Sequence, residues 1–424
     1  MNRQNVLAYI EENKESAITF LCELLKIDSS DIRHGLDGRE EEAQRFLRKR
    51  LQRIGMETRL CEPDYDRIRD YAECSHGHSY QGRPNLVGIM KGSGGGRSLI
   101  LNGHVDTMAA GDEKLWRYGP WSAEREGDNI YALGACDMKA GLAAAILAAE
   151  AIHKFTKLKG DLIVESVVDE EGGGNGTLDL VAQGYRADAA IISEPTELKI
   201  MTASRGVLVT HIRVTGEASH PNYKWEKANA IEKAFKVCQG LYELEHRWLA
   251  VKNHPTLPRP TITIGKIRGG VAGTAVPASC DMDFDIEFLP EEYGPDGACR
   301  KTTGKDILQE VTEAVRRTAA SDEWLKDHLP EIHVEQWVEP HSVEKDFELT
   351  AIMQRNHGEG IVSAFPAGCD ARHLAQAGIP TLIYGPGSMS DAHNINEKVS
   401  VSQFITCIKT LALTIMDWCG VEES

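Results

Sequence analysis

The sequence lacks any C-x-x-C pair, although it contains 10 cysteines. The cysteines are scattered as single residues, for example Cys22, Cys136 and Cys369. Because paired cysteines are the usual signature of a thiolate metal site, their absence argues against such a site here. No export signal is recognisable either, so we expect reduced thiols in a cytoplasmic protein, many of them serving as small core residues.

Runs of lysine and arginine longer than three residues are also missing. The chain carries 47 Lys and Arg residues against 64 Asp and Glu residues, which gives a formal net charge of −17. Nucleic acids and anionic membrane surfaces both require a basic face, so we expect neither as a partner. The expected partner is instead a small-molecule substrate, because of the motifs at the ends of the predicted strands.

No apolar segment is long enough to cross a bilayer. The longest one, GLAAAILAAEAI, is rich in alanine and is bounded by Lys139 and His153. Residues 1–27 mix charged and apolar side chains at helical spacing, which is unlike a signal peptide. The sequence therefore predicts a soluble protein.

Internal repeats and low-complexity tracts are absent as well. A chain of 424 residues exceeds the size at which one core keeps growing, so two domains are expected. In residues 1–205 and 339–424, short apolar runs alternate with helical segments, the first of them near 4–26 and 39–54. This pattern predicts an α/β domain with a mostly parallel sheet and helices on both faces. Residues 206–338 contain period-2 strands and predict an inserted α+β domain with an antiparallel sheet.

Three adjacent carboxylates, Asp169, Glu170 and Glu171, follow an apolar run in the segment VESVVDEEGGGNG. Repulsion and desolvation make such a cluster costly unless a cation or a proton is shared. A bound dication would allow one residue to ligate while its neighbour acts as a base. The alternative is a solvated loop, since charge runs are usually exposed. For Asp169 we expect a structural role.

Further side chains of the metal-binding type stand near other predicted strand ends. His104 and Asp106 in LNGHVD would point the same way in an extended segment, so the carboxylate could hold the second nitrogen of the imidazole. An ordinary surface turn is the alternative for this pair. For Asp137, Glu194 and His393 the alternatives are a helix cap, a strand-end carboxylate and a solvated loop histidine.

Taken together, these residues suit a pair of metal ions better than one. Two imidazoles and three carboxylates would give each of two metals three protein ligands if one carboxylate bridges them. This number is typical of a two-metal hydrolytic site with about 3.5 to 4 Å between the ions, whose shared water loses a proton near neutral pH. The spacing along the chain alone does not bring the residues together.

The order of the motifs resembles a known family. Along the chain they are RPNLVG, LILNGHVDT, DNIYALGACDMKAGLAAAI, VVDEEGGGNG, ISEPTEL, GEASHP, GCDARHLAQAGIPTLIYGPG and AHNINEKV. This set resembles the M20 metallopeptidases, in the branch of acetylornithine deacetylases, succinyl-diaminopimelate desuccinylases and aminoacylases. The resemblance extends from about residue 4 to about residue 415.

The resemblance implies two divalent metal ions, expected to be zinc, for which cobalt or manganese could substitute. It implies that His104, Asp137 and Glu194 hold one ion. The other ion would be held by Asp137, Glu171 and His393, so that Asp137 forms the bridge.

Other matched positions imply roles around the substrate. Glu170 matches the general base, and Asp106 matches the carboxylate that orients the imidazole of the first site. Arg372 in CDAR matches an arginine that grips a substrate carboxylate. The inserted domain resembles a lid that is also a dimerisation surface, which predicts a homodimer, and His220 matches a lid histidine that stabilises the oxyanion. Most relatives carry an asparagine where this chain has Thr274, which puts that substrate contact in doubt.

The predicted function is that of a dinuclear metal-dependent hydrolase. It would cleave the amide of a small N-acylated amino acid or related amine, as deacetylases and desuccinylases do. A dipeptidase or carboxypeptidase on the same scaffold is one alternative, and hydrolysis of an N-formyl or carbamoyl amide is another. A catalytically silent binding protein is disfavoured, because all six matched metal and base positions carry chemically competent residues.

Overall fold

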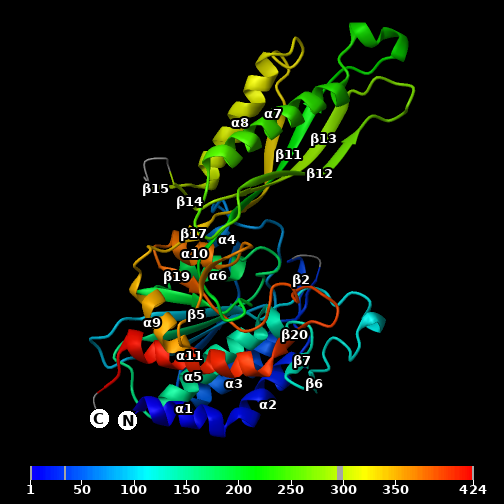
Figure 1. Cartoon of the computed structure of the whole chain (residues 1–424). Coiled ribbons are helices and arrows are strands. Elements are labelled where there is room, and N and C mark those ends of the chain that lie inside the picture. The colour runs from blue at the N-terminus through cyan, green and yellow to red at the C-terminus, as the bar shows by residue number, and fades with distance from the viewer. Residues whose placement is uncertain (1, 33–34, 294–298, 423–424) are drawn as a thin grey trace. The chain divides into compact units, whose positions relative to one another are not determined.

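The computed structural model describes residues 2–32, 35–293 and 299–422 (Figure 1). The chain forms two compact units. The first unit comprises residues 1–202, 342–365 and 369–424, and the second comprises residues 203–341 and 366–368. The boundaries predicted from the sequence, at 205/206 and 338/339, lie near these but do not coincide with them. The short segment 366–368, which the prediction placed in the first domain, belongs with the second unit.

A nine-stranded mixed sheet forms the centre of the first unit, in the order β17-β10-β19-β9-β5-β8-β4-β3, with β18 paired to β10. Its central pairs, β5 with β8, β5 with β9 and β9 with β19, are parallel. Every residue of β5 and of β8 is buried, which explains their continuous apolar runs. The strands are β3 (Glu57–Cys61), β4 (Asn85–Met90), β5 (Leu99–His104), β8 (Leu162–Val167), β9 (Ala189–Ile192), β10 (Ile200–Ser204), β17 (His341–Ser342), β18 (Val362–Phe365) and β19 (Thr381–Ile383).

Helices cover both faces of this sheet. Figure 1 shows α5 and α11 on one face and α6 and α10 on the other. Residues 140–149 of α5 are all buried, and its many alanines let it pack closely against α11 within the main core. The helices are α1 (Asn2–Glu12), α2 (Lys14–Leu25), α3 (Glu41–Arg53), α4 (Tyr65–Ile68), α5 (Ala140–His153), α6 (Asn175–Gln183), α9 (Glu348–His357), α10 (Ala371–Gln376) and α11 (Val401–Cys419).

The remaining short elements of the first unit lie in its connecting segments. The N-terminal helical segment expected near residues 4–26 is divided in two at Asn13, whose side-chain amide donates to the carbonyl of Tyr9 (2.8 Å). The short elements are β1 (Asp31–Ile32), β2 (Asp37–Gly38), η1 (Glu113–Leu115), β6 (Glu124–Glu126), β7 (Asn129–Tyr131), η2 (Ala135–Lys139) and β20 (Lys398–Ser400).

The second unit is an antiparallel sheet with two long helices packed against it. Its sheet has the order β12-β13-β11-β16, and buried residues alternate with less buried ones along β11 and β13. The buried face packs with α7 and α8 into a separate hydrophobic core. The elements are β11 (Gly206–Thr215), η3 (Pro221–Glu226), α7 (Ala230–Val251), β12 (Thr261–Gly269), β13 (Ser279–Phe288), β14 (Glu291–Tyr293), β15 (Cys299–Lys301), α8 (Gly304–Ala320) and β16 (Glu331–Val338). The predicted fold class, α/β with a second antiparallel unit, is confirmed.

Two absences are visible in the described residues. No disulfide bond joins any cysteines in these ranges, and most of the cysteines are buried. No helix in the described ranges is long and apolar enough to cross a membrane.

Candidate active site

Two groups of metal-type side chains meet in the first unit and share one residue. His104, Asp137 and Glu194 each offer a ligand atom within 4.8 Å of the others, and the same holds for Asp137, Glu171 and His393. The Asp137 carboxylate lies between the two imidazoles, with its Oδ1 3.0 Å from His104 Nε2 and its Oδ2 3.3 Å from His393 Nε2. His393 Nε2 is also 2.9 Å from Glu171 Oε2. The five residues that the sequence predicts as ligands are therefore brought together.

The topology of the sheet explains this meeting. His104 is the last residue of β5, while Glu171 follows β8 and Glu194 follows β9. Because these three strands are parallel neighbours, their carboxyl ends lie at one edge of the sheet, where α/β proteins place their functional residues. His393 follows β19 in the chain, and β19 is the parallel neighbour of β9. His393 has a positive φ of 57°.

Asp137 is held by a turn just before α5. The turn begins at Gly134, which has a φ of 75° that favours glycine. The buried carboxylate of Glu397 accepts hydrogen bonds from three backbone N–H groups, those of Gly134 (2.9 Å), Cys136 (2.8 Å) and Asp137 (3.1 Å). Burial, together with the charge of Asp137, raises the pKa of Glu397 to about 7. Glu397 lies in the motif AHNINEKV, but no pattern in the sequence predicts a role for it.

His104 is oriented by Asp106, but chiefly through the main chain. The carbonyl oxygen of Asp106 is 2.9 Å from His104 Nδ1, whereas its carboxylate Oδ1 lies 3.6 Å from that nitrogen. The other carboxylate oxygen accepts a hydrogen bond from the backbone N–H of Glu171 (3.0 Å). Asp106 thus contacts two of the candidate ligands, and fixing the far nitrogen of an imidazole presents its Nε2 to a metal.

Glu170 borders His104 but is not a member of either candidate ligand group. Its Oε2 lies 4.0 Å from His104 Nε2, and its side chain is largely buried. Burial raises the pKa of Glu170 to about 8, and the charges of Asp370, Glu171 and Asp137 add to that rise, although His104 opposes it. Its role as the general base stays a prediction.

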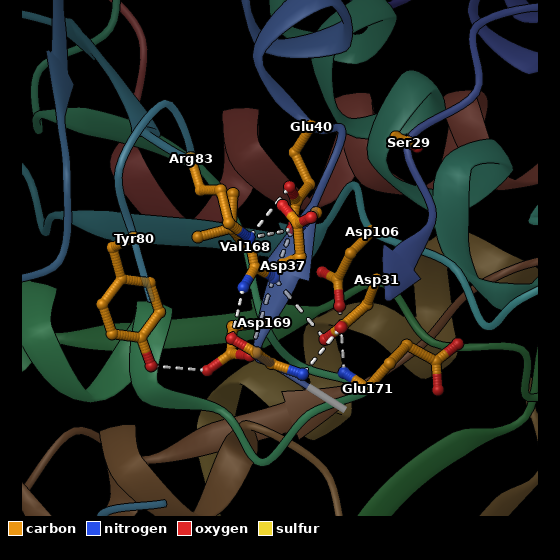
Figure 2. Close-up of polar contacts among 12 residues, drawn as sticks. Ser29, Asp31, Asp37, Glu40, Tyr80, Arg83, Asp106, Val168, Asp169 and Glu171 are labelled. Atoms are coloured by element: carbon orange, nitrogen blue, oxygen red, sulfur yellow. Dashed lines mark hydrogen bonds and ion pairs between the residues drawn. The ribbon is translucent and has the colours of Figure 1, made fainter. Parts of the chain in front are cut away.

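Asp169 anchors the turn that carries Glu170 and Glu171. Figure 2 shows Tyr80 and Arg83 converging on its carboxylate, which accepts a hydrogen bond from the Tyr80 hydroxyl (2.7 Å) and lies 3.7 Å from Arg83 Nη2. Asp169 has a φ of 68°, and its backbone carbonyl accepts from the N–H groups of Gly173 and Gly174. Its buried side chain therefore fixes a sharp bend at the end of β8.

Arg83 balances the negative charges behind this turn. Its side chain is 1% exposed and binds Glu40, with Nη2 2.5 Å from Oε1, while Asp31 Oδ2 lies 3.5 Å from the same nitrogen (Figure 2). A buried carboxylate is tolerated when it is paired in this way.

Arg372 and its neighbour His373 lie in α10, close to the glycine turn after Glu171. The Arg372 side chain is 6% exposed, and its Nε lies 3.1 Å from Oε1 of Glu73. Its role in binding a substrate carboxylate stays a prediction.

His220 and Thr274 belong to the second unit, where they stand on neighbouring segments. Both residues are exposed. The two segments pair at Ser219 and Val276, with a backbone hydrogen bond of 2.8 Å. Their predicted roles toward the substrate are not tested by this arrangement.

Comparison with known proteins agrees with this geometry. The sequence profile described as peptidase family M20/M25/M40 matches residues 100–417. The chain belongs to this family. A relative from Halalkalibacterium halodurans, named N-formyl-4-amino-5-aminomethyl-2-methylpyrimidine deformylase, is 30% identical over 99% of this chain and 98% of its own length. An acetylornithine deacetylase from Myxococcus xanthus is 29% identical over 79% of this chain and 84% of its own length. Both names describe hydrolysis of an amide, so the predicted enzyme class, an M20 amide hydrolase, is confirmed.

The fold also matches solved M20 structures. The YXEP protein of Bacillus subtilis, described as a dinuclear metal-binding peptidase of the M20 family, superposes with a TM-score of 0.65 at 14% identity, over 96% of this chain and 99% of that one. This likeness concerns the fold alone.

The donor set in this M20 chain fits two dications. Each group combines one imidazole with two carboxylates, a set that suits zinc and similar metals. Burial and the charge of Asp137 raise the pKa of Glu194 well above its ordinary value, so the cluster carries more buried negative charge than its histidines balance. Although burial opposes ionisation, hydrogen bonds with both histidines keep the pKa of Asp137 below its ordinary value. A cation would relieve the crowding at Glu194 and take the place of protons on the imidazoles.

Proposed function

We propose that the chain is a dinuclear metal-dependent hydrolase that removes a formyl or similarly small acyl group from the nitrogen of a small amine. The observation that carries this proposal is the Asp137 carboxylate, which lies between two imidazoles and belongs to two ligand groups, with Glu170 beside them. The similarity to the deformylase over nearly the full length of both chains supports a formyl group.

Five residues would hold the two ions: His104, Asp137, Glu171, Glu194 and His393. We take zinc as the native metal, with cobalt or manganese able to substitute. When bound, the ions lower the pKa of a water molecule and polarise the carbonyl of the amide.

Glu170 is the proposed general base. It takes a proton from the attacking water as the oxygen adds to the acyl carbon. It then delivers this proton to the amine nitrogen as the carbon–nitrogen bond breaks, so that a carboxylate and an amine leave. His220 of the second unit is proposed to donate a hydrogen bond to the oxyanion, and Thr274 to stand at the position of an asparagine that contacts substrate in relatives.

A homodimer through the second unit is also proposed. Helix α7 carries three exposed apolar residues at intervals of seven, Phe235, Tyr242 and Leu249. Residues with this spacing lie on one face of a helix, and an exposed apolar stripe of this kind suits contact with a second copy.

A substrate screen tests the proposed function. The full-length protein, loaded in turn with zinc, cobalt or manganese, is incubated with N-formyl-4-amino-5-aminomethyl-2-methylpyrimidine, N-acetylornithine, an N-succinyl amino acid and a dipeptide. We expect the N-formyl amine to give the highest kcat/KM and the release of formate to stop after chelation. Faster cleavage of the acetyl, succinyl or peptide substrate would contradict the formyl assignment. No turnover of any of the four with any of the metals would contradict the function itself.

A further inference from the structure

The guanidinium of Arg372 is already paired with a carboxylate of its own chain. Arg372 Nε lies 3.1 Å from Glu73 Oε1, and Glu73 Oε2 lies 3.6 Å from Nδ1 of His373. The side chains are 6%, 9% and 0% exposed for Arg372, Glu73 and His373, so the pair is shielded from water. An ion pair in such surroundings is screened little by salt.

The two terminal nitrogens of the guanidinium are also engaged. Nη1 donates to the carbonyl of Cys369 (3.1 Å), and Nη2 donates to the carbonyl of Gly173 (2.7 Å). Bidentate recognition of a substrate carboxylate needs a free pair of N–H groups on one edge of the fork. Here each terminal nitrogen gives one N–H to a main-chain carbonyl, and Nε lies in ion-pair contact with Glu73 without forming a hydrogen bond, so contacts within the protein itself hold the fork.

The contact with Gly173 places Arg372 beside the candidate active site. Gly173 lies two residues after the ligand Glu171, in the turn that Asp169 anchors. The carboxylate of Asp370, two residues before Arg372, faces the same turn, because a Cβ added at Gly174 would contact both Asp370 Oδ1 and Arg372 Nη2. A substrate carboxylate arriving here would meet several negative groups and an arginine whose charge is already neutralised.

We propose that Glu73 is a specificity-determining residue, whose carboxylate occupies Arg372 in place of a substrate carboxylate, so that the enzyme selects N-acyl amines that carry no carboxylate beside the amide. This inference rests on the proposed function. The favoured substrate class is an uncharged N-formyl aminomethyl arene or heterocycle, and N-acyl amino acids are disfavoured by charge.

A matched pair of substrates tests this inference on the metal-loaded, full-length enzyme. N-formylbenzylamine and N-formylphenylglycine have the same leaving amine except for one carboxylate. We expect the wild-type enzyme to prefer N-formylbenzylamine by about tenfold or more in kcat/KM, because the carboxylate of the acid would lose water and face negative groups while Arg372 is paired with Glu73. In Glu73→Gln the arginine is released, so kcat/KM for N-formylphenylglycine should rise by about tenfold, mainly through a lower KM.

Three further variants make the result specific. Glu73→Asp keeps the negative charge and should retain the wild-type preference. In the double variant E73Q/R372Q both charges are removed, so the gain for the acid should vanish. Glu42→Gln, at an exposed position of α3, should leave kcat/KM unchanged for both substrates. Thermal unfolding of each variant reports whether it is folded.

The outcomes separate the inference from the proposed function. The inference is wrong if the wild-type enzyme cleaves the acid as well as the neutral amide, or if Glu73→Gln leaves their ratio unchanged while it remains folded. If Glu73→Gln does not fold, a loss of the neutral preference in Glu73→Asp would overturn the inference, and its retention would support it. If neither substrate releases formate with any of the metals, the proposed function fails and the inference fails with it.

Discussion

The carboxylate of Glu397 accepts a hydrogen bond from the backbone N–H of Asp137 at 3.1 Å. Asp137 is the residue that both ligand groups share, and Glu397 is 1% exposed. The same carboxylate binds two other N–H groups of the turn, so one buried side chain determines where the central ligand stands. Glu397 therefore holds in place the residue that both candidate ligand groups share.

Replacing Glu397 by glutamine should weaken the metal centre. The glutamine amide has one acceptor oxygen, and its NH₂ group would face N–H donors, which leaves buried polar groups unpaired at a cost of about 1 to 3 kcal/mol each. We expect a lower metal content by elemental analysis and a kcat reduced by about tenfold or more. Glu124→Gln, at an exposed position of β6, serves as the control. Full metal occupancy and normal turnover in Glu397→Gln would contradict the positioning role.

Alanine substitutions at Glu170 and at His104 should have different effects on metal content and turnover. Glu170→Ala should keep a nearly normal metal content and lose turnover by about a hundredfold or more, because it removes the proton carrier and not a ligand. His104→Ala should lose metal, and turnover with it. Elemental analysis and kcat measured on the same samples distinguish the two effects. Retention of full activity by Glu170→Ala would rule out the base assignment, and chelation of the wild-type protein should abolish activity until a dication is restored.

Much of the fold and the grouping of the candidate ligands could be predicted from the sequence because the relevant signals are local. The apolar runs of β5 and β8 mark buried parallel strands, and parallel strands bring their carboxyl ends, with His104 and Glu171, to one edge of the sheet. The resemblance carried by the ordered motifs then implies a shared role for Asp137, which belongs to both candidate ligand groups.

The supporting contacts could not be predicted, since they join residues far apart in the chain. Glu397 and Asp137 are separated by 260 positions, and no periodicity links them. The pairing of Arg372 with Glu73 depends on a loop whose path no local pattern specifies. Similarly, the spacing of His104 and Asp106 suggests a contact between their side chains, whereas the nearer partner of the imidazole is the main-chain carbonyl.

Tyr80→Phe should disturb the turn that carries Glu170 and Glu171 without removing a ligand. The variant lacks the hydroxyl that donates to Asp169 at 2.7 Å, so a buried carboxylate loses a partner. We expect a loss of stability of about 1 to 3 kcal/mol and a lower kcat at nearly normal metal content. Thermal unfolding, metal analysis and kcat are the measurements. Tyr71→Phe, at an exposed position, is the control, and an unchanged kcat in Tyr80→Phe would show that the turn does not depend on this bond.

Glu165→Gln should change how stability depends on pH. Burial raises the pKa of Glu165 to about 7, and the charge of Asp370 adds to the rise, while a hydrogen bond from Asn102 (3.0 Å) opposes it. The native state therefore holds this proton more tightly than the unfolded state does. The corresponding stability is present below the ordinary pKa and is lost as pH rises through about 7.

Glutamine at position 165 does not titrate, so the variant does not lose stability in this way as the pH rises. Its stability relative to the wild-type protein should rise between about pH 4.5 and about pH 7, by at most about 3 kcal/mol, and then level off. Calorimetric Tm values, measured for both proteins in the presence of a chelator, give the comparison. A difference that stays constant with pH would show that Glu165 does not carry a raised pKa.

Two substitutions on α7 should separate the proposed dimer. Phe235 and Tyr242 are 58% and 42% exposed and lie on one face of the helix, while Trp248 and the other core residues of α7 face the sheet. Glutamates at both exposed positions would bury charge in a contact between copies, which is costly without a partner. Light scattering after gel filtration should give the mass of a dimer for the wild-type protein and that of a monomer for F235E/Y242E. Arg247→Glu, an exposed position away from the stripe, should remain dimeric. A wild-type monomer, or a dimer that survives both glutamates, would exclude α7 as the interface.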